Sequence, residues 1–412
     1  MNLLPHLRSL RVLAAVAQAG SSQAAATLLH VAQSSVSRAV QQLEAALASP
    51  LFERSARGMC VTPQGSQLAL RTQRALQFLA EADRHHPRSA HTPWHGSLLA
   101  RGVTARHLHV LQAIAERGSE ARAAVQLGVS QPAVHQALRQ LEHMVGASLC
   151  IRARSGLRLD DAGDALLLAS RLAQAELRQA EDEWAEPGGG LQGRLAIGTL
   201  PFSTTMLLAP SVEQLLVQQP ATRVVLVDGT FEALVAQLRR AELDCVVGAL
   251  RNQPPADDLT QEVLFEDRLA VMVRAGHPLA QQPSLTWAAL RSAQWVLPMP
   301  HTPAEQAFVQ MLQAANLAPP PDQLRANSAL MMQAMLLGSD RLALMSPRQV
   351  APEVQAGLLV TLPLPVQHAP RPIGVLWRSA YLPTPAAAQW QSIMRQWGAS
   401  LCELKTRPAP HP

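Results

Sequence analysis

The sequence predicts a multidomain protein in which two small helical units precede a larger α/β region. Its 412 residues are too many for one compact core, and a 48% hydrophobic content is enough to fill several cores. Residues 7–65 recur at 105–163, which indicates a duplicated unit. Beyond residue 193, short β-type runs alternate with helical stretches, a succession typical of α/β domains.

The repeat has a fixed offset of 98 residues and extends without a gap over 59 positions, of which 22 are identical. In the first copy, Leu10, Leu13 and Ala17 recur at three- and four-residue steps and predict one apolar helix face. Gly20 and Ser21 predict the end of that helix and the cap of the next one. Glycine accepts the left-handed exit, and serine accepts a hydrogen bond from a free backbone N–H group.

A second short helix has small residues at Ala25 and Ala26, and a turn follows at His30-Val31. A third helix is predicted from about residue 33 to 47, with one apolar and one polar face. The apolar residues are Val36, Val40, Leu43 and Leu47, and the polar ones are Gln33, Ser34, Ser37, Arg38 and Gln41. Two short helices joined by a tight turn, the second polar on its outer face, predict a helix-turn-helix, whose second helix enters the major groove of DNA.

The charge distribution permits a polyanionic partner. The formal net charge is +5, and residues 1–110 hold eleven Arg against four acidic residues, whereas residues 111–186 hold eight Arg against eleven acidic residues. Lys405 is the one lysine of the chain, so nearly every cation is a guanidinium suited to phosphate and to guanine edges. A composition that merely reflects GC-rich coding is the alternative explanation.

Several classes of protein are disfavoured. The four cysteines (Cys60, Cys150, Cys245 and Cys402) are far apart and indicate neither a disulfide framework nor a zinc site. The apolar run after Arg11 is too short for a signal peptide, and no run approaches the ~18 residues of a membrane span. No catalytic motif, phosphate-binding loop or metal-ligand spacing is present, so we expect a cytoplasmic protein that is no enzyme and needs no metal or cofactor.

Five motifs stand in ordered spacing over some 60 residues. They are Ala25-Ala26, Gln33-Ser34-Ser35-Val36-Ser37, Leu43-Glu44, Leu51-Phe52-Glu53-Arg54 and Thr62-Pro63-Gln64-Gly65. Together they resemble the N-terminal signature of LysR-type transcription regulators, a winged helix-turn-helix. The resemblance implies that the start of the recognition helix meets base edges, and that the wing and nearby basic residues hold phosphates.

Carried over by position, the resemblance implies candidate DNA contacts in both copies. In the first copy they are Gln33, Ser34, Ser37 and Arg38 for bases or backbone, with Arg54 and Thr62 for phosphates. In the second copy they are Gln131, His135, Arg139 and Arg152. A structural salt bridge is the alternative role for Arg54.

Both copies depart from the family pattern. The first has Ala32 where the family has a capping serine, a loss of about 1 kcal/mol in helix stability. The second has His135 in place of serine, Cys150 in place of phenylalanine, and Asp160-Asp161 in place of threonine and proline, where carboxylates would repel phosphates. We therefore expect copy one to be the main reader. Copy two is then an auxiliary reader, or a packing and dimerisation module.

The segments between these units are expected to be helices and a connector. Residues 67–83 read as a helix, which in LysR-type proteins pairs with its twin in the dimer, and residues 85–104 read as a flexible connector. Four histidines there suggest a solvated linker, with metal binding as the alternative. A second long helix is predicted from about Ala162 to Trp184, ended by Pro187 and three glycines; it is the better candidate for the main dimerisation helix.

The C-terminal region predicts a parallel sheet with helices on both faces. The strands are expected at about 195–198, 224–227 and 245–248, with helices at 206–218 and 231–240. Residues 193–198, 243–248 and His277-Pro278-Leu279 resemble parts of the LysR-type effector domain, which is similar to periplasmic binding proteins. The resemblance implies two lobes, with the chain leaving the first near residue 267 and returning near 367, and a ligand in the cleft.

The candidate effector contacts lie at strand ends and helix starts. They are Thr199, Ser203, Thr204, Thr230, Arg251, Asn327 and Ser328. Each hydroxyl or amide has the alternative role of a helix cap, and Arg251 that of a solvated loop arginine. Ligand binding is expected to close the lobes and rotate the reading heads, which shifts a pre-existing equilibrium.

The expected fold class is multidomain: two all-α winged helix-turn-helix domains followed by an α/β two-lobed effector-binding domain. The expected boundaries are 1–65 and 105–163 for the two winged units, 66–104 and 164–190 for the linkers, 191–400 for the effector domain with its second lobe at about 267–366, and 401–412 for a tail. The resemblance implies a sequence-specific transcription regulator that binds double-stranded DNA and a small-molecule effector as a homodimer or homotetramer. A soluble receptor or enzyme whose repeats are assembly modules only is the alternative.

Overall fold

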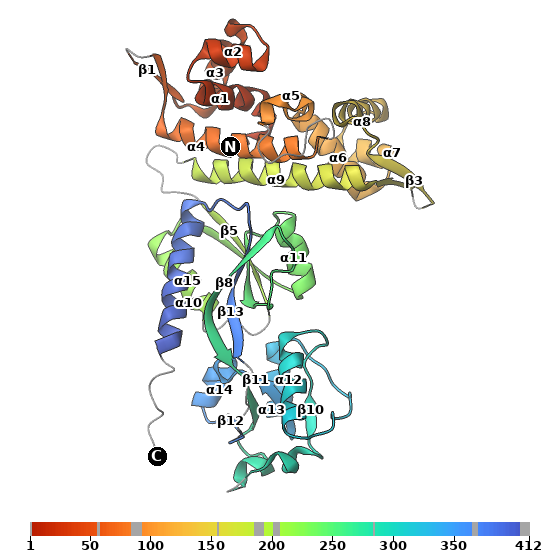
Figure 1. The fold of residues 1–412 in the computed structure, drawn as a ribbon, viewed down its shortest axis with the longest axis vertical. Coiled ribbons are helices and arrows are strands. Elements are labelled where there is room, and N and C mark those ends of the chain that lie inside the picture. The colour runs from red at the N-terminus through yellow and green to blue at the C-terminus, as the bar shows by residue number, and fades with distance from the viewer. Residues whose placement is uncertain are drawn as a thin grey trace. The chain divides into compact units, whose positions relative to one another are not determined.

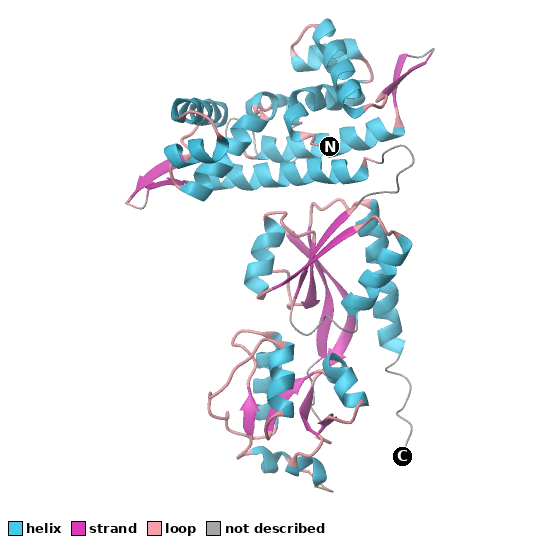
Figure 2. Ribbon diagram, turned by 180° about the vertical axis from the view of Figure 1, so that it is seen from behind, coloured by secondary structure: helices cyan, strands magenta, loops and turns pink. Residues whose placement is uncertain are grey.

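A computed structural model describes residues 2–55, 58–83, 93–154, 156–184, 193–200, 207–282, 285–364 and 370–403. The chain divides into two compact units, residues 1–192 and 193–412. Figure 1 shows the elements of each unit in chain order, and Figure 2 shows that helices dominate the first unit while the second contains two sheets.

The N-terminal unit passes twice through the same succession of three helices, a two-stranded antiparallel sheet and one long helix. We call α1 to α4 the first repeat and α6 to α9 the second repeat. The first has α1 Leu7–Ala19, α2 Ser22–Leu29, α3 Gln33–Leu47, β1 Phe52–Ser55, β2 Gly58–Val61 and α4 Pro63–Glu81. The second has α6 Ala105–Arg117, α7 Glu120–Leu127, α8 Gln131–Val145, β3 Cys150–Ala153, β4 Gly156–Leu159 and α9 Asp161–Glu183. Every element of the second repeat starts 98 residues after its counterpart, the offset of the sequence repeat.

The turns of the two repeats reach the same backbone conformation with different residues. Gly128 and Gly146 end α7 and α8 with left-handed φ angles of 65° and 71°. His30 and Ala48 occupy the equivalent positions after α2 and α3, with φ angles of 55° and 50°. Residues with a Cβ atom adopt this conformation at an energetic cost, so packing in the first repeat enforces the helix ends that glycine permits in the second.

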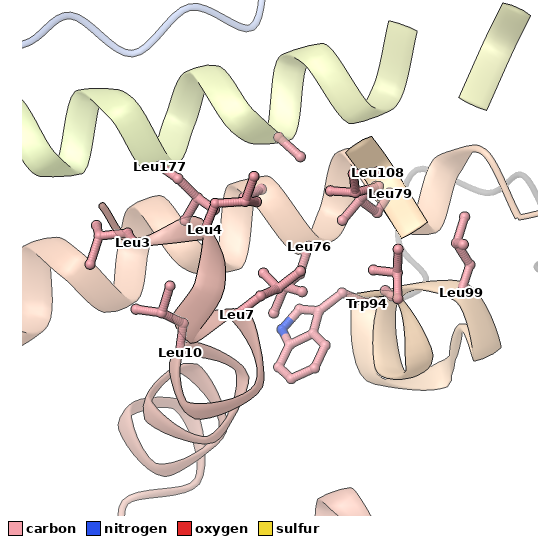
Figure 3. Close-up of a cluster of buried hydrophobic side chains, with 14 of the residues drawn as sticks. Leu3, Leu4, Leu7, Leu10, Leu76, Leu79, Trp94, Leu99, Leu108 and Leu177 are labelled. Carbon is pink, nitrogen blue, oxygen red and sulfur yellow. The ribbon is translucent and has the colours of Figure 1, made fainter. Parts of the chain in front are cut away.

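One hydrophobic cluster runs through both repeats. The long helices α4 and α9 pack along each other in opposite directions (Figure 1). Figure 3 shows Leu177 of α9 next to Leu4, in the 3-10 helix η1 (Leu4–His6), and Leu79 of α4 next to Leu108 of α6. Leu79 and Leu177 are equivalent at the repeat offset, so each long helix contributes the same position to the shared core.

The flexible connector predicted at 85–104 is wrong for residues 93–104; residues 84–92 lie outside the described part of the chain. A 3-10 helix, η2 Trp94–Gly96, and a short helix, α5 Leu98–Gly102, pack into the shared core, with Trp94 and Leu99 buried. Proline, glycine and histidine flank these apolar residues, so the sequence pattern indicated a loop and not packed helices. Arg11 fixes the segment by donating to the carbonyls of Ala100 at 2.8 Å and Val103 at 2.7 Å.

The first lobe of the C-terminal unit is built on a five-stranded sheet of order β6-β5-β7-β13-β8. The strands are β5 Arg194–Thr199, β6 Arg223–Asp228, β7 Cys245–Ala249, β8 Leu259–Arg268 and β13 Pro370–Arg378, and the helices are α10 Ala209–Gln218, α11 Phe231–Arg239 and α15 Pro385–Glu403. α10 and α15 cover one face and α11 the other. β5, β6 and β7 are parallel as predicted, but β13 runs antiparallel to β7 and β8, so the sheet is mixed.

The second lobe has a four-stranded sheet of order β10-β11-β9-β12. Its strands are β9 Ala270–Arg274, β10 Gln294–Val296, β11 Arg341–Met345 and β12 Leu359–Thr361. Its helices are η4 Pro278–Gln281, η5 Trp287–Leu290, α12 Pro303–Ala314, α13 Ala329–Leu337, η6 Pro347–Val350 and α14 Ala351–Gln355. The chain crosses from one sheet to the other between β8 and β9 and returns between β12 and β13. Because the chain crosses twice, β9 to β12 form a separate lobe, and a cleft lies between this lobe and the first.

Within the described residues, no single helix has both the length and the apolar composition of a membrane span. The N-terminal helical stretch Leu4–Ala19 reaches these thresholds only when it is joined to α2, and the chain bends by 118° between them.

Candidate functional site

The first repeat presents the polar face of α3 to solvent. Gln33, Ser34 and Arg38 are exposed and Ser37 is half-buried, whereas Val36 and the other apolar residues of α3 lie in the core. The amide of Gln33 lies 3.5 Å from the hydroxyl of Ser37. The structure therefore brings the four predicted base-contacting residues together on one accessible helix surface.

The equivalent surface of α8 is also exposed, but acidic groups accompany it. Gln131, His135 and Arg139 are exposed. The ring of His135 lies 3.2 Å from the carboxylate of Glu120, and Arg139 donates to Glu142 at 3.1 Å. By contrast, Arg38 makes no ion pair with any residue that the structure describes. α3 therefore keeps the guanidinium of Arg38 available, while α8 shares that of Arg139 with Glu142.

The thiol of Cys150, on β3, lies near acidic residues of the second repeat. Burial, which has the largest effect, and the charges of Glu142, Asp160 and Glu120 together raise the pKa of Cys150 to about 12. Arg152, two residues along the same strand, is exposed. The β3–β4 hairpin of the second repeat thus combines three exposed arginines, Arg152, Arg154 and Arg158, with nearby carboxylates whose negative potential opposes phosphate.

The predicted phosphate contacts of the first wing differ in their surroundings. Arg54 lies on β1 opposite Met59 of β2, and its side chain is outside the described part of the chain. Thr62 is buried, and its hydroxyl caps α4 by accepting from the N–H of Gly65 at 3.0 Å. Asp160 has the same role in the second repeat, where its carboxylate accepts from Gly163 at 2.9 Å. Both side chains are therefore engaged as helix caps.

A cavity of about 220 Å³ lies between the two lobes of the C-terminal unit. Thr230 and Arg251 line it from the first lobe, and Asn327 from the second. The hydroxyl of Thr230 also caps α11 by accepting from the N–H of Ala233 at 3.3 Å, which is the alternative role predicted for it. Apolar residues form most of the remaining wall: Leu200, Phe231, Pro298, Met299, Pro300, Met332, Leu344 and Met345.

Two other predicted effector contacts, Thr199 and Ser328, are not among the described residues that line this cavity. Thr199 is buried at the end of β5, and Ser328 caps α13 by accepting from the N–H of Met331 at 3.3 Å. Ser203 and Thr204 lie outside the described residues.

Sequence reasoning missed Arg371, which lines the cavity from the start of β13. Its guanidinium is buried and donates to Asp267 at 2.8 Å, while its Nε has no hydrogen-bond partner among the described groups. Arg251 stands with its guanidinium 4.4 Å from the centre of the Phe231 ring. Burial lowers the pKa of both arginines. The charge of Asp267 opposes this shift for Arg371, and the charge of Glu232 opposes it for Arg251. In the sequence, the feature that could have marked Arg371 was its charge at the start of an otherwise apolar strand.

An exposed polar recognition helix in one unit and a ligand-sized cleft between two α/β lobes in the other define a ligand-responsive DNA-binding regulator. The comparisons with known proteins specify the family. The domain described as the LysR substrate binding domain matches residues 188–399, and the bacterial regulatory helix-turn-helix of the lysR family matches residues 7–66 and 105–164. The chain belongs to the LysR family of transcription regulators, which confirms the resemblance, and it is not an enzyme.

Two curated relatives differ in how much of this chain they cover. The HTH-type transcriptional regulator GalR of Pseudomonas putida is 36% identical over 393 residues, which are 95% of this chain and 97% of that protein. The regulator PcaQ of Agrobacterium fabrum is 28% identical over 301 residues, 73% of this chain and 97% of its own length. The alignment with GalR thus spans both repeats, whereas PcaQ leaves about a quarter of this chain unmatched.

A solved structure shares the fold. A single-residue variant of full-length OxyR from Pseudomonas aeruginosa aligns with a TM-score of 0.51 at 19% identity, over 70% of this chain and 97% of that one. This likeness supports an N-terminal helix-turn-helix domain followed by a two-lobed α/β effector-binding domain.

Proposed function

We propose that both repeats are winged helix-turn-helix domains, and that α3 of the first repeat is the main reader of duplex DNA. The exposed polar face of α3, with Gln33, Ser34, Ser37 and Arg38, carries this proposal. Arg38 has its guanidinium available for phosphate or guanine, whereas Arg139 of α8 is shared with Glu142. The second repeat then contributes weaker contacts through Gln131, His135, Arg139 and Arg152. The regulator acts in the cytoplasm as a homodimer or homotetramer.

Footprinting of the full-length protein on the DNA upstream of its own gene tests this ranking. Replacing Ser37 and Arg38 by alanine removes the main contacts and is expected to weaken binding roughly 10- to 100-fold. Replacing His135 and Arg139 is expected to weaken it less, and Gln67→Ala, an exposed position on α4, serves as the control. Equal losses from the two pairs contradict the ranking. Binding with no sequence preference at any salt concentration would instead favour a receptor whose repeats only assemble the protein.

The effector is proposed to be a small organic anion with an apolar body. The cavity of about 220 Å³ is small beside the ~300–1,000 Å³ of common ligand pockets, so it suits a compact ligand. Arg251 and Arg371 line a wall that is otherwise largely apolar, apart from polar residues that include Glu232, 4.0 Å from Arg251. The free Nε of Arg371 is a buried donor that a carboxylate oxygen would satisfy.

Thermal-shift measurements with benzoate and succinate, each beside its uncharged amide, test the class of ligand. A carboxylate that binds the cleft is expected to raise the unfolding temperature, and its amide is not. Arg251→Gln should remove most of the shift. Arg239→Gln, which breaks the exposed ion pair with Asp258 elsewhere on the same lobe, should keep it. Equal shifts from acid and amide, or an unchanged shift in Arg251→Gln, contradict an anion site.

A further inference from the structure

The two repeats are joined as a pair inside one chain. Their long helices, α4 and α9, lie antiparallel, and one continuous hydrophobic cluster includes residues of both repeats. α3 and α8 lie toward opposite ends of this helix pair in both views (Figures 1 and 2). Each recognition helix precedes its long helix by the same succession of elements. Antiparallel long helices therefore orient the two recognition helices in opposite senses.

Buried ion pairs fix this pairing. Arg71 of α4, with a side chain only 1% exposed, donates to Glu176 at 3.0 Å and to Gln179 at 2.9 Å, and it also pairs with Glu183. Arg74, one turn further along α4, contacts Glu176 at 2.8 Å. Residues later in α4 thus meet residues earlier in α9, as the antiparallel arrangement requires. Removing one partner of such a buried group leaves an uncompensated charge, so the contacts are highly specific.

In these ion pairs α4 supplies the arginines and α9 supplies the carboxylates. The charges therefore favour pairing of α4 with α9 over pairing of two identical helices. At the offset of 98 residues, Arg71 and Arg74 correspond to Ala169 and Leu172 of α9, and Glu176 corresponds to Phe78 of α4. Two copies of α9 paired with each other would place buried Glu176 against Ala169 and Leu172, without a cation. Two copies of α4 would place Arg71 and Arg74 against Phe78, with Glu81 as one remaining acid at the position of Gln179. Only α4 with α9 matches the full set of charges.

The surfaces that the pair presents also differ. α3 begins with Gln33-Ser34-Ser35-Val36-Ser37-Arg38, whereas α8 begins with Gln131-Pro132-Ala133-Val134-His135-Gln136. We propose that one chain is a complete pair of DNA-reading heads, held together by α4 and α9, that recognises two unlike half-sites in inverted orientation. This inference rests on the proposed DNA-reading role of both repeats. It adds that the pairing is intramolecular and that the target of each chain has two different halves.

Selection of binding duplexes from a random pool by the full-length protein tests the form of the target. The expected product is a two-part motif with unlike halves. Replacing Ser37 and Arg38 by alanine should then remove protection of one half only, and replacing Gln131 and His135 should remove protection of the other half. A one-part motif or two identical halves, with both halves lost in the same variant, overturns the pairing inference but leaves the DNA-binding function standing. Enrichment of no motif at all overturns the proposed function itself.

Charge reversal tests whether the pairing is intramolecular. Arg71→Glu with Arg74→Glu, and Glu176→Arg with Glu183→Arg, should each weaken binding to the two-part duplex at least tenfold. The variant with all four changes restores every ion pair with the charges exchanged, and it should recover to within about threefold of the parent. Co-expression of the two half-reversed chains should not recover binding, because each chain pairs its own helices. Recovery in the mixture equal to that of the four-change variant overturns the inference, since it requires pairing between chains. If circular dichroism shows that the half-reversed chains are unfolded, recovery of folding in the four-change variant but not in the mixture makes the same test.

Discussion

At the scale of single residues, the two repeats perform the same task at the same position even where the residue has changed. Thr62 and Asp160 both cap a long helix by accepting from the glycine three residues later. That glycine, Gly65 or Gly163, has no room for a side chain, since an added Cβ would lie 2.4 Å from the carbonyl oxygen of Leu51 or 2.2 Å from that of Leu149. The close approach of each long helix to this backbone carbonyl explains why both copies have glycine here.

Gly65→Ala and Gly163→Ala are therefore expected to destabilise the N-terminal unit by about 1–3 kcal/mol each, because backbone rather than a flexible side chain must move. Urea unfolding followed by circular dichroism measures the change. Ser66→Ala, at an exposed neighbour, is the control and should change the free energy of unfolding by less than about 0.5 kcal/mol. An alanine tolerated at both glycine positions would show that the strand adjusts freely.

Arg371 gives a second prediction at this scale. Arg371→Met removes the cation from Asp267, whose carboxylate is also buried and is held at its other oxygen by the hydroxyl of Ser346 at 2.9 Å. We expect a loss of about 3–5 kcal/mol in the unfolding free energy of the C-terminal unit, measured by tryptophan fluorescence in urea.

The double variant Arg371→Met with Asp267→Asn should recover much of that stability, because it leaves no unpaired charge. If the double variant were as unstable as the single one, the lost packing of the arginine and not the stranded carboxylate would be the cause.

Among the single helices, residues of a capping type stand before several helix starts, but only some of them form the capping hydrogen bond. The hydroxyl of Ser21 accepts from the N–H of Ala24 at 3.1 Å and so caps α2. Ser130 precedes α8 in extended conformation, but its side chain makes no capping bond. Ala32, its counterpart before α3, has the same extended backbone. Ser130 therefore forms no capping hydrogen bond that Ala32 lacks. The loss of helix stability predicted for Ala32 is not supported by a bond at the equivalent serine.

Ser21→Ala is expected to lower stability by about 1 kcal/mol through loss of the cap. Ser130→Ala should stay within about 0.5 kcal/mol of the parent, because no bond is lost. Thermal unfolding of the two variants side by side makes the comparison, and each is the control for the other. A larger loss at Ser130 than at Ser21 would contradict the assignment of the caps.

At the scale of the whole molecule, pairing within one chain changes how many reading heads an oligomer carries. If both repeats read DNA as proposed, a homodimer of this chain carries four recognition helices in two pairs, and each pair combines α3 with an α8 that Glu120 and Glu142 accompany. Assembly of the chains then sets the distance between pairs, while α4 and α9 set the geometry within a pair.

Salt dependence should report the number of heads engaged. The observed affinity falls with the logarithm of salt concentration in proportion to the phosphates contacted. For a duplex with both half-sites we expect a slope roughly 1.5 to 2 times that for a duplex in which the half read by α8 is scrambled. The factor stays below two because the acidic residues of the second repeat reduce its phosphate contacts. Equal slopes would show that only one head touches DNA.

Much of this architecture was predictable from the sequence because it depends on local patterns. The three-helix succession follows from apolar spacing and from turn residues such as Gly20 and Ser21, and the repeat follows from identity at a constant offset. The exposed face of α3 was predictable for the same reason, since residues that alternate with a buried helix stripe must face solvent. Strand and helix alternation likewise predicted the first α/β lobe.

Other features depend on contacts between segments far apart in the chain. Arg71 and Glu176 are 105 residues apart, and nothing in either local pattern marks them as partners. Arg371 joins the cleft only because β13 returns to the first sheet beside Asp267. Local patterns alone were enough to predict the duplicated helical units, the exposed polar face of α3 and the α/β class. Contacts between distant segments decide which helices pair, that Arg371 joins Arg251 at the cleft and that Trp94 lies in a core, because burial and charge compensation are set by packing between elements.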